Sequence, residues 1–227
     1  MVGCPGSGKG TLSARIERHF GVPIITAGDL LRSHIRQGTP LGHAASASIR
    51  AGRLMPDATM MELVGAKLHT MQHDDWILDG FPRTLGQAQL LSAELARTQC
   101  PLSLVVQLHV PESVILQRIL ERWTHVPSGR VYNLSFNPPR TPGLDDVTGE
   151  PLEQSEDDNP TTFQRRLAGH HAQTEPMVEF FRTQTSPLGA PLVVDLEGRT
   201  SDEIWPQLQR VLIERGASLS TRTLCGP

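Results

Sequence analysis

Short apolar runs alternate along this chain with longer stretches in which apolar residues recur at helical spacing. The runs at residues 23–25, 76–78, 102–108 and 192–194 are rich in Ile, Leu and Val, as expected of buried parallel strands. Helical spacing covers residues 11–20, 28–37, 56–71, 84–97, 112–122, 161–183 and 201–215. This alternation predicts an α/β fold in which helices flank a parallel sheet.

Residues 125–159 interrupt the alternation. Prolines and glycines recur throughout this segment, which excludes a long helix, and the segment is too long for an ordinary connection. We interpret it as a small inserted subdomain that acts as a lid, with residues 131–132 and 134–136 pairing as short strands; a plain surface loop is the alternative. Residues 217–227 are expected to form a loose tail.

Composition and charge exclude several classes of protein. The chain has 38% hydrophobic and 20% charged residues, which is too apolar for a disordered chain, and its net charge of −3 indicates no nucleic-acid partner. No apolar run approaches the ~20 residues of a membrane span, so we expect a soluble protein. Cys4, Cys100 and Cys225 are too widely spaced to indicate a disulfide framework or a cysteine metal site. Only Lys9 and Lys67 supply lysine among the 21 basic residues.

The strongest local signal is a glycine-rich loop near the start of the chain. Residues 3–11 read Gly-Cys-Pro-Gly-Ser-Gly-Lys-Gly-Thr and lead directly into an amphipathic helix. Glycines let several backbone N–H groups turn inward, the helix presents its positive end, and a lysine reaches the phosphates. The hydroxyl that usually follows the lysine comes one residue later, at Thr11. The pattern predicts a phosphate-binding loop in which Lys9 contacts a nucleoside triphosphate.

A second sequence element, a strand that ends in an acidic residue, complements this phosphate-binding loop. The strand predicted at residues 76–78 ends in Asp79 and Gly80. A carboxylate at the end of a parallel strand lies at the same edge of the sheet as the phosphate loop, where it can serve nucleotide-bound magnesium. Asp79 is therefore our candidate for the carboxylate that serves this magnesium.

These two elements together resemble adenylate kinases. Residues 79–84, Asp-Gly-Phe-Pro-Arg-Thr, and the Gly-Lys-Gly-Thr form of the loop at residues 8–11 carry the resemblance, which extends from residue 2 to about residue 212. Five further stretches resemble the mitochondrial branch of that family, which uses GTP and AMP: residues 122–125, 128–133, 136–139, 145–151 and 204–206.

The resemblance implies the fold of a P-loop nucleoside monophosphate kinase, with a core of five parallel strands. The core would comprise residues 1–25, 56–120 and 159–216. A small helical insert at residues 26–55, here called the AMP insert, would bind the monophosphate. A small β subdomain at residues 121–158, here called the lid segment, would close over the triphosphate.

The resemblance also implies roles for individual residues. Those expected to hold the triphosphate are Gly6, Ser7, Gly8, Lys9, Gly10, Thr11, Arg122 and Tyr132. Those expected to hold AMP are Ala27, Arg32, Arg53, Leu54, Met55, Gly80, Phe81, Pro82, Arg83, Gln87 and Arg166. Those expected to take part in catalysis are Lys9, Asp79, Arg83, Arg118, Arg122 and Arg166. Planar bidentate arginines suit this reaction because it consists mostly of positioning and charge neutralisation on phosphoryl oxygens.

Expectations about metals follow from the same resemblance. Mg²⁺ would be held by the nucleotide phosphates and water, with Asp79 behind the water. Some relatives carry four zinc-binding cysteines in the lid at positions where this chain has His125, Ser128, Asp145 and Thr148. We expect a hydrogen-bonded polar cluster in place of zinc, and no metal bound directly by the protein.

Three positions depart from the family pattern. The family has a full apolar strand before the phosphate loop, whereas here only Met1 and Val2 precede it, so we expect a largely missing first strand and neighbouring strands without partners. Ser155 stands where active relatives place a phosphate-clamping arginine, which predicts slow turnover. Ala27 replaces a hydroxyl that usually meets AMP.

The function predicted from these residues is phosphoryl transfer from GTP to AMP. An ATP:AMP kinase is one alternative, and a nucleotide-binding regulatory protein with weak catalysis is another, favoured by Ser155 and the short start. We expect a monomer that binds GTP or ATP, and AMP. By resemblance, we place it in the mitochondrial matrix.

Overall fold

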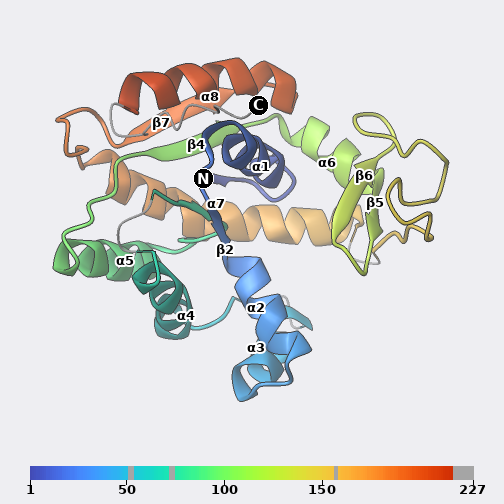
Figure 1. The fold of residues 1–227 in the computed structure, drawn as a ribbon, viewed down its shortest axis with the longest axis horizontal. Coiled ribbons are helices and arrows are strands. Elements are labelled where there is room, and N and C mark those ends of the chain that lie inside the picture. The colour runs from blue at the N-terminus through green and yellow to red at the C-terminus, as the bar shows by residue number, and fades with distance from the viewer. Residues whose placement is uncertain (51–53, 72–74, 156–157, 217–227) are drawn as a thin grey trace, which may run out of the picture.

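The computed structural model describes residues 1–50, 54–71, 75–155 and 158–216, and it has a parallel α/β core (Figure 1). One sheet has the strand order β1 (Val2–Gly3), β4 (Val105–His109) and β7 (Val193–Glu197). A second sheet pairs β2 (Ile24–Thr26) with β3 (Ile77–Asp79). All of these pairings are parallel. The α/β class and the predicted strands are therefore confirmed.

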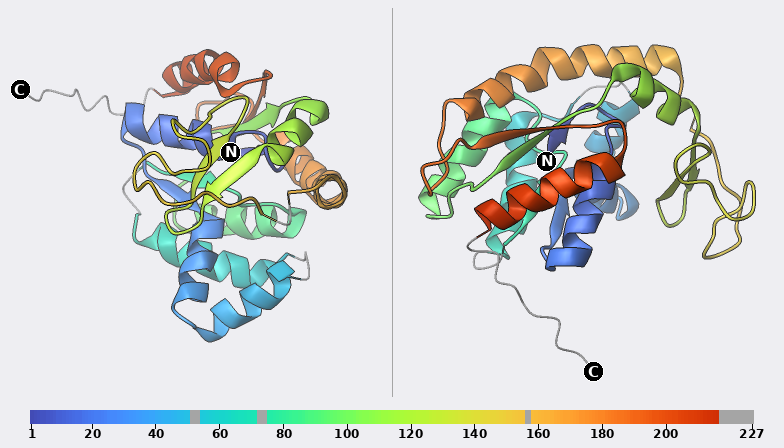
Figure 2. Two further views of the ribbon diagram at one scale, coloured as in Figure 1. Left: turned by 90° about the vertical axis from the view of Figure 1, so that its right-hand side faces the viewer. Right: turned by 90° about the horizontal axis from the view of Figure 1, so that it is seen from above.

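Helices cover both faces of the sheet, as Figure 2 shows from above. On one face lie α1 (Lys9–Phe20) and α8 (Ser201–Arg215), and on the other α7 (Pro160–Arg182) with α5 (Leu85–Arg97) and α6 (Glu112–Leu120). Neighbouring residues of β4 point to opposite layers, because side chains alternate along a strand. Val105 packs with Met177 of α7, and Val106 packs with Leu12 of α1.

The predicted helices all form, and one helix is additional. Between α2 (Ala27–Arg36) and α4 (Asp57–His69), the structure contains α3 (Pro40–Arg50), which packs against α2. A Cβ added at Gly42 would lie 2.2 Å from the carbonyl oxygen of His34, so only glycine permits this close approach of the two helix backbones. These helices project at the bottom of Figure 1.

The lid segment contains an antiparallel pair that differs from the predicted one. β5 (Arg122–His125) pairs with β6 (Arg130–Asn133), whereas residues 134–136 form a turn rather than a strand. The side-chain oxygen of Asn133 accepts hydrogen bonds from the backbone N–H groups of Ser135 and Phe136, which turns the chain at this point. The prediction that 131–132 pair with 134–136 is therefore wrong.

The first strand is short, and this divides the core. β1 pairs with β4 only at Val2 and Gly3. Towards β3 it contributes the amino group of Met1, which donates a hydrogen bond to the carbonyl of Leu78 at 2.9 Å. β3 and β4 thus belong to separate hydrogen-bonded sheets on either side of β1.

Of the helices that the structure describes, none combines the length and apolar character needed to cross a bilayer. The boundaries proposed for the core, the AMP insert and the lid segment remain predictions.

Candidate active site

The glycine-rich loop bends back from β1 and ends at the amino terminus of α1. Gly6 and Gly8 have φ angles of +85° and +90°, which other residues rarely adopt. No side chain caps the helix at Gly8, and no acidic residue occupies its first turn. The first backbone N–H groups of α1 are therefore not capped by a side chain and can bind an anion. Ser7 is buried, and its hydroxyl has no hydrogen-bond partner among the described residues.

Lys9 is anchored across this loop. Its ammonium group donates to the carbonyl oxygens of Gly3 at 2.7 Å and Cys4 at 2.8 Å. Burial lowers the pKa of Lys9 to about 8, while the carboxylate of Asp79 opposes that shift and Arg83 adds to it. The loop therefore holds a desolvated cation beside the uncapped helix end.

Asp79 lies at the carboxyl end of β3, as the sequence predicts, and is only 8% exposed. A Cβ added to Gly10 in the first turn of α1 would lie 3.7 Å from its Oδ2. The carboxylate therefore faces the helix that follows the loop, which brings the two sequence signals together.

Arg83 lies on the same side of the sheet edge. Its Nε donates to the carbonyl of Gly80 at 2.8 Å, and its backbone N–H donates to the side chain of Gln87, also at 2.8 Å. Burial lowers the pKa of Arg83, Asp79 opposes this, and the positive charge of Arg166 contributes to it. Two of the predicted phosphate-binding arginines thus influence each other electrostatically.

Two further predicted arginines lie at the end of α6 and the start of β5. Arg118 donates to the carbonyl of Arg199 at 2.5 Å, and its guanidinium lies 4.9 Å from the centre of the Phe136 ring. Burial lowers the pKa of Arg118. Arg122 forms a bidentate ion pair with the buried carboxylate of Asp158, in which Nε lies 2.8 Å from Oδ2. Arg118 and Arg122 therefore already have protein partners.

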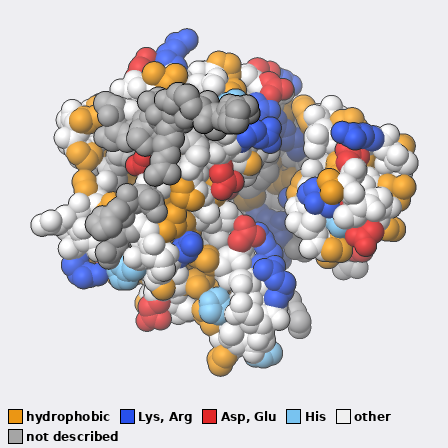
Figure 3. All heavy atoms as spheres, in the orientation of Figure 1, with side chains coloured by type: hydrophobic (Ala, Val, Ile, Leu, Met, Phe, Trp, Pro, Cys, Tyr) orange, Lys and Arg blue, Asp and Glu red, His pale blue; other side chains and the backbone are white. Residues whose placement is uncertain are grey.

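Basic side chains gather in the hollow between the lobe at the right of Figure 3 and the rest of the molecule. His170 was not predicted to belong to this region, because the adjacent His170 and His171 are typical of a solvated helix face. His170 lies one helical turn after Arg166 on α7, and burial together with the charge of Lys9 lowers its pKa to about 4. The spacing of four residues from Arg166 was the available signal, because residues i and i+4 share a helix face.

The positions predicted to bind AMP lie in different parts of the structure, and only some of them follow one another directly. Gly80, Phe81, Pro82, Arg83 and Gln87 follow β3 directly, and Phe81 and Gln87 are buried. Ala27 is buried and Arg32 is exposed, donating to Asp29 at 3.1 Å through Nε. Met55 is buried and Leu54 is exposed. Arg53 lies outside the described residues.

The four polar lid residues do come together. His125 shares hydrogen bonds with Ser128 at 2.7 Å and Thr148 at 3.4 Å, and the hydroxyl of Thr148 donates to Asp145 at 3.0 Å. Arg130 was not foreseen: it binds Asp145 through two bonds of 2.7 Å and lowers the pKa of that carboxyl. This cluster ties both strands of the β5–β6 pair to the segment at residues 145–148.

Tyr132, predicted to contact the triphosphate, has a buried side chain whose hydroxyl donates to Asp145 at 2.9 Å. Its hydroxyl therefore belongs to the lid cluster in this structure. The carbonyl of Ser155, the position without the expected arginine, accepts a hydrogen bond from the N–H of Asp158 at 2.9 Å.

A glycine loop that opens a helix at the carboxyl edge of a parallel sheet defines a phosphate-binding protein of the P-loop class. Comparison with known proteins narrows this class. The family model described as adenylate kinase matches residues 1–186. The chain is 40% identical over 220 residues to "GTP:AMP phosphotransferase, mitochondrial" of Saccharomyces cerevisiae, covering 95% of this chain and 92% of that protein. It is 41% identical over 215 residues to the protein of the same name from Drosophila melanogaster, covering 95% and 94%. The chain belongs to the adenylate kinase family.

Proposed function

We propose that the protein transfers the terminal phosphoryl group of GTP to AMP, giving GDP and ADP. The observation that carries this proposal is Lys9, a desolvated ammonium group held by two loop carbonyls beside an uncapped helix terminus. The relatives named as GTP:AMP phosphotransferases support the choice of substrates. The ATP:AMP reaction is not the one that these relatives' names indicate.

In this reaction an oxygen of the AMP phosphate attacks the γ-phosphorus of GTP, and the bond to the β-phosphate oxygen breaks. The charge that moves is spread over phosphoryl oxygens, so the protein contributes positioning and positive charge. Lys9 and the amides of residues 6–11 hold the triphosphate. Arg83 and Arg166 hold the AMP phosphate in line with it, and Arg118 and Arg122 reach the γ-phosphate once they leave their present partners.

The residues fit a role for Mg²⁺. The buried carboxylate of Asp79 faces the start of α1, and oxygen ligands and waters suit this cation. Bound with the nucleotide, Mg²⁺ would supply positive charge to its phosphates. Asp79 would bind waters of the ion rather than the ion itself.

The AMP side is assigned to the helices α2 and α3 and to the loop after β3. Arg32 and Arg83 bind phosphate, Gln87 stays buried behind the loop, and Ala27, Leu54 and Met55 line the base and ribose. The four-residue lid cluster takes the structural place of a metal. The protein acts as a monomer in the mitochondrial matrix, a location that the names of the relatives support as far as the organelle.

Ser155 favours a second candidate, a nucleotide-binding protein with slow turnover. A serine supplies no charge at a position where a donor lost from the transition state commonly costs about 10²–10³ in rate. The discriminating quantity is the turnover number relative to the nucleotide affinity.

A coupled assay for GDP and ADP formation tests both candidates. Purified protein is given MgGTP or MgATP with AMP, and Lys9→Met is compared with Lys67→Met, which removes the chain's other lysine from an exposed site on α4. We expect turnover with GTP that Lys9→Met abolishes and Lys67→Met leaves intact. Tight nucleotide binding without turnover would favour the second candidate, and absence of both would refute the proposal.

A further inference from the structure

Thr174 is a buried polar residue within α7, and no step of the proposed reaction uses it. The residue is only 7% exposed, and its hydroxyl donates a hydrogen bond to the backbone carbonyl of Arg83 at 3.2 Å. A threonine inside a helix often bonds a carbonyl of its own preceding turn. Here the hydroxyl instead ties α7 to the loop after β3, residues 80–84, which lies far away in the sequence.

Both polar groups of the Arg83 main chain have partners on helices. Its N–H donates to the side chain of Gln87 on α5 at 2.8 Å, while its carbonyl accepts from Thr174 on α7. The end of the loop is held as well, because the hydroxyl of Thr84 accepts from the N–H of Gln87 at 3.1 Å and donates to Asp57 at 2.9 Å. Hydrogen bonds from α5 and α7 thus fix the backbone of one arginine.

The guanidinium of Arg83 follows its own backbone closely. Its Nε donates to the carbonyl of Gly80 at 2.8 Å, and a Cβ added to Gly80 would lie 3.1 Å from a terminal nitrogen of the guanidinium. Gly80, which has a φ of +76°, therefore lets the side chain fold back on the loop that carries it. Because the side chain is bonded to its own loop, a shift of the loop moves the charged group with it.

Helix α7 also carries the second arginine assigned to the AMP phosphate. Arg166 lies about 12 Å before Thr174 along the helix, at ~1.5 Å per residue. The positive charge of Arg166 contributes to the lowered pKa of Arg83, so the two guanidinium groups repel each other. One helix therefore supplies one guanidinium and holds the backbone of the other against that repulsion.

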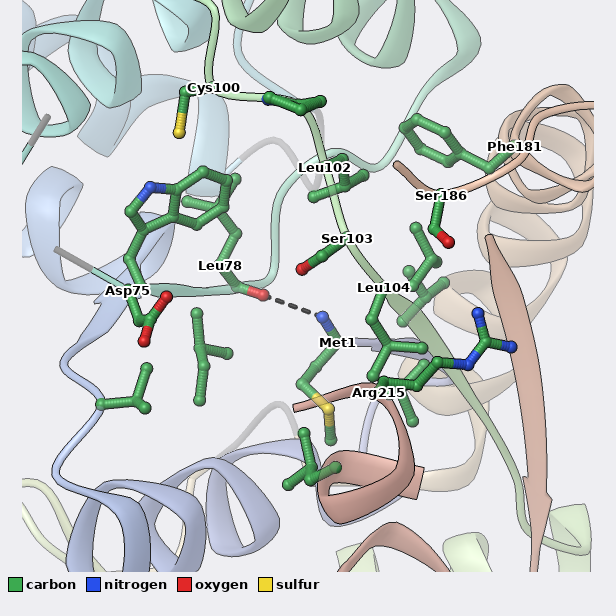
Figure 4. Close-up of a pocket in the computed structure, with 18 of the residues that line it drawn as sticks. Met1, Asp75, Leu78, Cys100, Leu102, Ser103, Leu104, Phe181, Ser186 and Arg215 are labelled. Atoms are coloured by element: carbon green, nitrogen blue, oxygen red, sulfur yellow. Dashed lines mark hydrogen bonds between the residues drawn. The ribbon is translucent and has the colours of Figure 1, made fainter. Parts of the chain in front are cut away.

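The apolar side chains of the loop lie in a different environment. Phe81 and Pro82 line an apolar cavity of about 290 Å³, to which Phe181 of α7 also contributes (Figure 4). Atoms that line a cavity lack packing partners on that side. The hydrogen bond from Thr174 is therefore the contact that gives the loop a fixed point on α7.

We propose that Thr174 is a positioning residue for the monophosphate: it fixes the main chain of Arg83 to α7 and so sets the distance between the guanidinium groups of Arg83 and Arg166 before AMP binds. This inference rests on the proposed transfer of a phosphoryl group to AMP. Thr174 does not itself bind the phosphate, and it acts through the position of Arg83. A misplacement of about 1 Å in a group that positions a substrate can cost about 10²-fold in rate.

Thr174→Val and Thr174→Ser separate the hydroxyl from the methyl group. Valine removes the donor and keeps the shape, whereas serine keeps the donor and removes a buried methyl group. In the coupled assay with MgGTP, we expect Thr174→Val to lower kcat/KM for AMP about tenfold with KM for GTP unchanged, and Thr174→Ser to retain most of the activity. Thr183→Val is the matched control and should change neither constant, because the hydroxyl of Thr183 bonds the carbonyl of Phe180 at the end of α7, at 2.8 Å.

A double-mutant cycle shows whether Thr174 acts through Arg83. The Kd for AMP is measured by isothermal titration for Thr174→Val, for Arg83→Met and for the double variant. We expect Thr174→Val to weaken AMP binding several-fold alone, and not at all when Arg83 is already replaced, because the group that it positions is then absent. A purely structural role would weaken AMP binding equally in both backgrounds.

The outcomes separate this inference from the proposed function. An unchanged kcat/KM for AMP in Thr174→Val, an equal loss in Thr174→Ser, or an equal further loss in the Arg83→Met background would overturn the inference alone. Absence of AMP binding and turnover in the unchanged protein would overturn the proposed function, and the inference with it. Thr174→Ala, whose smaller side chain admits water to the carbonyl of Arg83, takes the place of a valine variant that does not fold, with the same expected loss.

Discussion

Nucleotide affinity should fall steeply as pH rises through 8, because Lys9 then loses its charge. The ammonium group is desolvated within the phosphate loop, and its pKa is about 8 rather than the usual 10.5. A base carries its charge below its pKa, so Lys9 is about 90% charged at pH 7 and about 10% charged at pH 9. If only the charged form binds phosphate well, the affinity for MgATP falls about tenfold across this interval.

The measurement is a Kd for MgATP at half-unit steps from pH 6.5 to 9.5 at constant ionic strength. MgATP is the suitable probe because neither its adenine nor its phosphates titrate between pH 7 and 9. Lys9→Arg is the matched variant, since a guanidinium stays charged throughout this range. Its profile of Kd against pH should be flat, whatever its affinity at pH 7.

A flat profile for the unchanged protein would refute the reasoning. It would mean that Lys9 keeps its proton well above pH 9, so that the two carbonyl bonds and Asp79 outweigh desolvation. An equally steep profile in Lys9→Arg would assign the titration to another group.

Three further outcomes are expected. Ser155→Arg should raise kcat by about tenfold or more, with little change in the Kd for GTP, because it restores a cation that stabilises the transition state. An unchanged kcat in the coupled assay would show that the other arginines suffice. Gly42→Ala should raise KM for AMP and lower Tm, because its Cβ would lie 2.2 Å from a backbone oxygen of α2. Gly169→Ala on α7 is the matched control, since it too lacks a positive φ and no atom lies within 4 Å of the added Cβ, and it should not lower Tm. Finally, the amino group of Met1 has a pKa lowered from 8.0 to about 6, so its proton opposes folding below pH 6 and this penalty disappears above pH 8. Urea unfolding should therefore show stability rising by about 3 kcal/mol from pH 5.5 to 8.5 relative to the protein acetylated at this amino group, and parallel profiles would contradict the burial of this group.

The core could be predicted from the sequence because its pattern of apolar residues is strong and each element shows it locally. Parallel strands buried on both faces appear as apolar runs, and their helices carry clear spacing. Helix α3 was missed for the opposite reason. Its sequence is rich in Ala and Ser, and its position depends on the close backbone approach at Gly42, which is a tertiary effect.

The central elements of the candidate site could likewise be predicted from the sequence. The phosphate loop and Asp79 are contiguous motifs, and the fold brings them together. The pairing within the lid was mispredicted because β5 consists of Arg, Trp, Thr and His, which shows no apolar alternation. Sequence spacing likewise gave no sign that Tyr132 and Arg130 both bind Asp145, since that contact joins residues more than ten positions apart.

The ion pair between Arg122 and Asp158 joins the two chain segments that connect the lid segment to the core, because β5 begins at Arg122 and α7 begins just after Asp158. The side chain of Gln154 also donates to the carbonyl of Leu120 at 2.6 Å, so these two segments are joined at more than one point. If Arg122 binds a phosphate, as proposed, it gives up Asp158, and nucleotide binding then removes one of the links that hold the lid segment against the core.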